Sequence, residues 1–108
     1  MKDDRLYLIH ITECIERVRE YTSAGRSVFM TSHITQDAVV RNLQTMAEST
    51  QRLSDAVKDA HPEIDWSGIM GFRNVLTHGY LGLDPERVWN IVEHELSALE
   101  RFARDALG

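Results

Sequence analysis

Apolar residues recur along the first part of the chain at the three- and four-residue spacing of an amphipathic helix. This stripe predicts a helix from about Asp3 to Thr22, and Gly25 is placed to end it. The polar residues between the apolar ones predict that one face packs on a core while the other stays exposed. The apolar positions are Leu8, Ile11, Ile15 and Val18, with Leu6, Cys14 and Tyr21 at the margins.

A second, longer stripe follows a short connection in which Phe29 is expected to fold back onto the core. Thr31 or Ser32 can cap the helix that carries it, and the pattern predicts that this helix continues to about Ala60. An unbroken 4-3-4-3-4 spacing of this kind is the seam of a helical bundle and requires a partner helix. The seam residues are Val39, Leu43, Met46, Thr50, Leu53 and Val57.

Two clear start signals divide the rest of the chain. After the helix-breaking His61-Pro62, Asp65 is expected to cap a helix that opens with Trp66. The sequence Asp84-Pro85-Glu86 then supplies an N-cap acid, a proline at the first helical position and a further acid, followed by one last apolar stripe to about Ala106. We therefore predict an all-α fold, an antiparallel four-helix bundle in which residues 1–108 form a single domain.

Composition limits the class of protein. The 108 residues are 43% hydrophobic and 27% charged, as is typical of a globular domain. No apolar run approaches the roughly 20 residues that cross a bilayer, and the start lacks the basic and apolar regions of a secretory signal. The single cysteine, Cys14, agrees with a reducing compartment. These features predict a cytoplasmic protein with no membrane partner.

His10 and Cys14 lie four residues apart, as two metal ligands on a helix could. A zinc site needs more ligands at such spacing, so ordinary packing is the favoured interpretation. We predict neither a metal site nor a cofactor.

The net charge of −5 argues against a dedicated nucleic-acid binder, which would carry a broad basic face. However, all basic residues except Lys2 and Lys58 are arginines, the side chain that binds phosphate bidentately. Local positive charge for a phosphate is therefore available.

The polar chemistry concentrates in one stretch, Arg73-Asn74-Val75-Leu76-Thr77-His78-Gly79-Tyr80. At about 100° per helical residue, the side chains of Arg73, Asn74, Thr77 and His78 share one arc opposite the apolar face. The wheel predicts that Arg73 and His78 both escape burial. They flank Asn74 and Thr77 and could hold a phosphate from two sides.

Arginine and histidine together suit RNA cleavage. Histidine titrates near neutral pH and can take a proton from a ribose 2′-hydroxyl or return one to a leaving oxygen, and arginine can stabilise the charge that develops on phosphorus. One histidine cannot easily be base and acid at once, which hints at two motifs meeting in a homodimer. The alternative is a non-catalytic helical subunit, in which the same arc binds a nucleotide or docks a partner.

The spacing Arg73-Asn74-x-Leu76-x-His78-x-Tyr80 resembles the Arg-x4-His-x-Tyr motif of the HEPN superfamily, specifically its HepT-like toxin ribonucleases. The resemblance extends over most of the chain and includes Asp37-Ala38-Val39-x-Arg41-Asn42-Leu43, Ile64-Asp65-Trp66, Gly71-Phe72, Gly82-Leu83-Asp84 and Val88-Trp89.

This resemblance implies the toxin of a type II/VII-like toxin–antitoxin system, a metal-independent endoribonuclease that acts as a homodimer. Its catalytic residues would be Arg73 and His78, and its partner a minimal nucleotidyltransferase antitoxin that neutralises it by AMPylation of Tyr80. The supporting active-site residues would be Asn74, Thr77, Arg41 and Asn42. Arg41, Asn42 and Glu48 could face the cleft, although a solvated helix face is the simpler interpretation for them.

Overall fold

A computed structural model describes residues 3–78 and 83–108 of the chain. Within these residues the chain forms seven helices and no strand, which confirms the all-α prediction. The helices are α1 (Asp4–Tyr21), α2 (Arg26–Thr31), α3 (His33–Gln51), α4 (Asp55–Asp59), α5 (Trp66–His78), α6 (Pro85–His94) and α7 (Leu96–Leu107).

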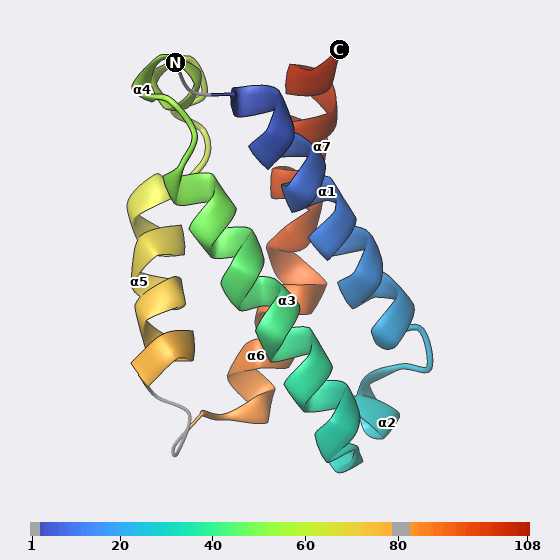
Figure 1. Cartoon of the computed structure of the whole chain (residues 1–108). Coiled ribbons are helices and arrows are strands. Elements are labelled where there is room, and N and C mark those ends of the chain that lie inside the picture. The colour runs from blue at the N-terminus through green and yellow to red at the C-terminus, as the bar shows by residue number, and fades with distance from the viewer. Residues whose placement is uncertain (1–2, 79–82) are drawn as a thin grey trace.

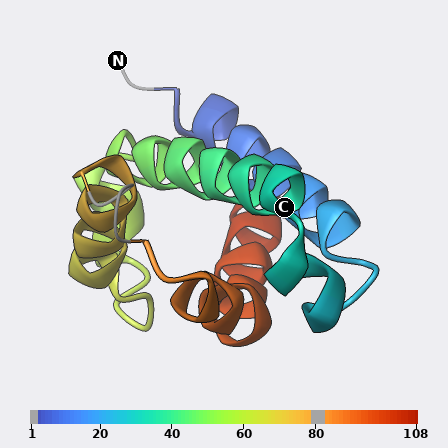
Figure 2. The same cartoon turned by 90° about the horizontal axis from the view of Figure 1, so that it is seen from below.

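The long helices form a bundle around α3 (Figure 1). Helix α3 packs against α1 on one side and against α5 on the other, while α7 packs against α1. Viewed from below, α1 and α3 lie side by side, and α5, α6 and α7 lie on one side of that pair (Figure 2). In the described ranges, no helix combines the length and apolar character that would let it span a membrane.

The core sits between these helices and takes its residues from the predicted stripes. Phe29 is buried in α2 and packs on Trp89 of α6, with ring centroids 5.4 Å apart, so the expectation that it folds back is confirmed. Burial of such apolar side chains supplies most of the driving force for folding. The core includes Leu8, Ile11, Ile15, Val18, Val39, Leu43, Met46, Leu53, Leu76, Val88, Val92, Leu96, Leu99 and Phe102.

The predicted helix starts are confirmed by their caps. The Ser32 hydroxyl accepts from the Thr35 amide at 3.1 Å, and the Asp65 carboxylate accepts from the Gly68 amide at 2.9 Å. Asp84 caps α6 with Pro85 at its start. Each cap satisfies an amide that has no partner inside its helix.

Two predicted helices are interrupted. The long helix expected to reach Ala60 ends at Gln51, and Ser54 starts the separate α4. Both Ser54 groups donate to the Asp4 carboxylate, the amide at 2.8 Å and the hydroxyl at 2.7 Å, which holds the break against α1. The last stripe is divided at Glu95 between α6 and α7. The apolar spacing continues through both breaks. It depends on which side chains are buried, and not on whether the backbone hydrogen bonds of a helix are continuous.

Candidate functional site

The motif helix α5 runs antiparallel to α3, and two side-chain contacts set their register. The Gln44 amide donates to the Thr77 hydroxyl at 3.1 Å, and the Gln51 amide donates to the Met70 sulfur. Gln44 and Gln51 are about two turns apart on α3, and Met70 and Thr77 are about two turns apart on α5. Residues midway between the two contacts therefore lie at the same height along the helix pair, and Glu48 of α3 is at the height of Arg73 of α5.

Arg73 is half-buried, which partly corrects the prediction that it escapes burial. Its Nη1 donates to the Asn74 side-chain oxygen at 3.5 Å, while its Nε is buried and has no hydrogen-bond partner in the described part of the chain. The helical wheel missed this because Met70 and Thr77, on the same arc as Arg73, contact α3. The arc therefore faces the flank of α3 and is only partly open to solvent.

The other motif residues differ in exposure. Asn74 is exposed, and Thr77 is half-buried against Gln44. His78 is the last residue of α5, but its side chain is not described. Tyr80 lies outside the described residues. Arg73, Asn74 and Thr77 are thus brought together on one surface beside the last turn of α5, whose final residue is His78.

The two residues proposed from α3 lie on different faces. Arg41 is exposed and precedes Gln44 by almost one turn, so it lies near the C-terminal end of α5. Asn42 precedes Ser49 by two turns, and Ser49 bonds to α1, which places Asn42 on the α1 side of α3. Its side-chain amide donates to the Ala38 carbonyl at 2.9 Å, so that donor is used within α3.

Glu48 is a half-buried acid level with Arg73. Among the ion pairs of the described residues, none joins Glu48 to Arg73 or to Arg52, one turn further along α3. The carboxylate therefore lowers the positive potential near Arg73 without neutralising it by direct contact.

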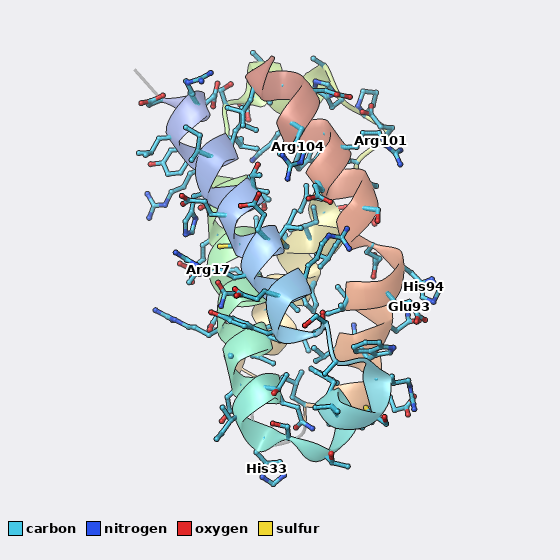
Figure 3. All side chains as sticks on the ribbon, turned by 90° about the vertical axis from the view of Figure 1, so that its right-hand side faces the viewer. Arg17, His33, Glu93, His94, Arg101 and Arg104 are labelled. Carbon is cyan, nitrogen blue, oxygen red and sulfur yellow. The ribbon has the colours of Figure 1, made fainter. Side chains whose placement is uncertain are left out.

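A second group of arginines lies on the face formed by α1 and α7 (Figure 3). Arg104 pairs there with Glu16 and with Glu100, both at 3.2 Å, and Arg19 pairs with Glu100 at 3.1 Å. These pairs cancel much of the positive charge of that face. Arg73 and Arg41 have no ion pair to any residue that the structure describes, and the same holds for Arg17 and Arg101 on the α1–α7 face.

A groove of about 580 Å³ lies between α5 and the helices α6 and α7, away from the motif arc. Its lining is mostly apolar and includes Ile69, Phe72 and Leu99, with Arg87 and His94 among its polar residues. The described motif residues Arg73, Asn74 and Thr77 do not line it. The motif arc, which is partly open to solvent beside α3, is therefore not a wall of this groove.

His10 and Cys14 belong to a packed polar cluster between α1 and α3. His10 Nδ1 lies 2.5 Å from the Ser49 hydroxyl, and the Cys14 sulfur lies 3.5 Å from both His10 Nε2 and the Thr45 hydroxyl. Burial raises the pKa of the Cys14 thiol, although the Thr45 hydrogen bond opposes this. In residues 3–78 and 83–108, no three His, Cys, Asp or Glu side chains gather as metal ligands would.

Sequence reasoning missed Gln44 and Gln51, the two α3 residues that contact the motif arc. Their two-turn spacing on one face of α3 is visible in the sequence. Nothing local, however, reveals which turn of α5 lies opposite each of them.

Comparison with known proteins places these observations in a family context. Residues 11–106 match the family model described as "Ribonuclease HepT-like". The chain is 33% identical over 98 residues to a probable ribonuclease HepT of Thermococcus cleftensis, covering 87% of this chain and 86% of that one. It is 31% identical over 111 residues to a protein of Caldanaerobacter subterraneus subsp. tengcongensis provisionally named as an RNase, covering 99% and 96%.

Another relative, from Methanocaldococcus jannaschii, carries a double name, gamma-glutamylcyclotransferase and provisional RNase. It is 32% identical over 100 residues, which are 92% of this chain and 45% of that protein. The chain thus spans less than half the length of this relative. No solved structure matches the chain significantly.

Proposed function

Because the chain belongs to the HepT-like ribonuclease family, we propose that it is an endoribonuclease that cleaves RNA with Arg73 and His78. One observation carries the proposal: Arg73 is half-buried at the family motif, and its Nε is buried without a hydrogen-bond partner among the residues that the structure describes. An orphaned buried donor is rare and costly, and it calls for an explanation such as a missing ligand. A phosphate oxygen is a suitable partner for a guanidinium.

The proposed step uses the substrate's own nucleophile. An imidazole of His78 removes the proton of a ribose 2′-hydroxyl, and the resulting oxygen forms a bond to the adjacent phosphorus. The bond from phosphorus to the 5′-oxygen breaks, and that oxygen is protonated as it leaves. The products are a 2′,3′-cyclic phosphate and a 5′-hydroxyl. The step needs no metal ion and no cofactor.

Arg73 would stabilise the extra negative charge on the phosphorane-like transition state. Removing one such donor from an active site typically slows catalysis by about 100- to 1,000-fold. Asn74 is exposed beside the guanidinium and accepts from its Nη1, so it would orient that group. Arg41, near the C-terminal end of α5, would bind a neighbouring phosphate.

We further propose that the active unit is a homodimer. The reaction requires both a base and an acid, and the motif of one chain supplies a single histidine. Two copies that bring their motif arcs together would supply one imidazole for each role. A monomer with full activity would contradict this part of the proposal.

Regulation would act on the same surface. We propose that a minimal nucleotidyltransferase attaches AMP to Tyr80 and so neutralises a toxin, because an anionic nucleotide close to Arg73 competes with RNA phosphate. Adding the transferase and ATP should raise the mass of the wild-type chain by adenylyl groups and stop cleavage. A Tyr80→Phe chain should gain no adenylyl group and remain active in the mixture.

The first test expresses wild-type and His78→Ala chains inducibly in bacteria without a partner. Growth arrest and cellular RNA ending in 2′,3′-cyclic phosphate are expected for the wild type only. His33→Ala is the matched control, because His33 is an exposed histidine at the start of α3 (Figure 3). Intact RNA in every culture would contradict the proposal and favour the non-catalytic binding subunit.

A further inference from the structure

The hydrogen bond between Gln44 and Thr77 joins α3 to the last turn of the motif helix. Both side chains are half-buried, and the Gln44 Nε2 lies 3.1 Å from the Thr77 Oγ1. Thr77 directly precedes His78 in the sequence. Of the α3–α5 side-chain hydrogen bonds formed by the described residues, this one lies nearest to the end of α5.

The end of α5 is intrinsically weak. The last four carbonyl groups of a helix have no partner within it, so terminal turns fray unless other contacts hold them. The next residue in the sequence is Gly79, a poor helix former, so the sequence supplies little local stability here. The tertiary hydrogen bond from α3, together with the buried Leu76 of the same turn, therefore helps to fix this end of the helix.

We propose that Gln44 is a positioning residue for RNA cleavage. It holds Thr77 against α3 and thereby fixes the point from which the His78 side chain leaves α5. The inference rests on the proposed ribonuclease function, but not on any contact between Gln44 and RNA. Because misplacing a catalytic group by about 1 Å can cost about 100-fold in rate, one hydrogen bond at this turn has a measurable effect.

The same helix pair contains a matched control. Gln51 lies two turns along α3, and its side-chain amide donates to the Met70 sulfur. Both glutamines are half-buried and bridge α3 to α5, but Gln51 contacts the first half of the motif helix. Replacing either glutamine by methionine keeps the length of the side chain and removes the donor.

The experiment measures RNA cleavage by purified Gln44→Met and Gln51→Met chains, together with their unfolding in urea. Gln44→Met should lower kcat about 10-fold with little change in KM, whereas Gln51→Met should cleave at the wild-type rate. Thr77→Val should reproduce the loss, and the double variant Gln44→Met/Thr77→Val should be no slower than either single variant. Such non-additivity identifies residues that act through one contact.

A second measurement does not depend on turnover. The imidazole signals of His78, assigned in NMR spectra by their loss in His78→Ala, should shift in Gln44→Met and stay in place in Gln51→Met. Equal rates and unmoved His78 signals in Gln44→Met would overturn the positioning role while leaving the ribonuclease function intact. A wild-type chain that cleaves no RNA would overturn the proposed function, and the positioning role of Gln44 with it.

Discussion

The two flanks of α3 differ in how completely their polar groups are paired. Toward α1, the polar side chains are joined to each other: His10 to Ser49 at 2.5 Å, and Cys14 to Thr45 at 3.5 Å. Toward α5, Gln44 is bonded to Thr77, but the Nε of Arg73 is buried with no hydrogen-bond partner among the described residues. Both flanks belong to the same helix and adjoin the same core, so their difference does not come from burial alone.

We propose that this difference separates a structural surface from a functional one. A buried polar group without a partner costs roughly 1–3 kcal/mol, and proteins retain such groups mainly where function needs them. The α1 flank is complete without a ligand. On the α5 flank, Arg73 Nε stays unpaired among the described residues, which supports our proposal that the chemistry lies on that side.

The largest expected effect is on the flank of α3 that faces α5, which we call the open flank. Arg73→Met keeps the aliphatic stem and removes the guanidinium, so cleavage should fall about 100- to 1,000-fold. The free energy of unfolding should stay the same or rise, because an unsatisfied buried donor is lost. Activity assays combined with urea unfolding test both statements, with the exposed Arg101→Met as control (Figure 3). A strongly destabilised Arg73→Met chain would mean that Arg73 is structural.

On the flank that faces α1, which we call the closed flank, we expect a loss of stability without a loss of activity. Ser49→Ala leaves His10 Nδ1 without its partner in a part-buried position, which should cost about 1–2 kcal/mol of unfolding free energy. Cleavage per folded molecule should not change. Urea unfolding and rate measurements on the same sample distinguish the two outcomes, and a loss of catalysis without a loss of stability would refute the division between the flanks.

Cys14 should make the free energy of unfolding depend on pH. Burial raises the pKa of its thiol, so the folded chain keeps the thiol proton to a higher pH than the unfolded chain does. The contribution of Cys14 is thus complete below the unfolded value, about 8.5, and is lost as the pH rises toward the folded value, by at most about 1.4 kcal/mol per pH unit. The stability difference between wild type and Cys14→Ala should therefore shrink in alkaline solution. A difference that is constant with pH would show that the thiol is not protected.

The smallest effect is expected at Asn42, one of the residues to which the resemblance assigns a supporting role. Its side-chain amide donates to Ala38 on the same helix, and it lies on the α1 side of α3. Asn42→Ala should leave the cleavage rate within about two-fold, since exposed or locally bonded side chains contribute little. A ten-fold loss of activity would place Asn42 in the active site after all.

Much of the fold was predictable because its signals are local. The caps at Asp65 and Asp84 follow from the sequence, and the α3 cap, Ser32, is one of its two candidates, since a cap and the amide it satisfies lie within a few residues of each other. The break before α4 was not, because the apolar spacing continues through Leu53. The partner that holds this break, Asp4, lies 50 residues away from Ser54 in the sequence.

The candidate site also has features that the sequence predicts and features that it does not. The helix that carries Arg73 and His78 and the shared arc of its polar residues follow from helical periodicity. The partial burial of Arg73 and the contact between Gln44 and Thr77 do not, because both depend on the register of α5 against α3. That register is a tertiary property, which one sequence does not encode in any local pattern.

The most direct test of the account incubates purified wild-type and His78→Ala chains with a defined RNA in the presence of a metal chelator. We predict that the wild type produces fragments with 2′,3′-cyclic phosphate and 5′-hydroxyl ends, and that His78→Ala leaves the RNA intact. Cleavage by His78→Ala at the wild-type rate, or wild-type cleavage that disappears with the chelator, would contradict the claim that Arg73 and His78 form a metal-independent ribonuclease site.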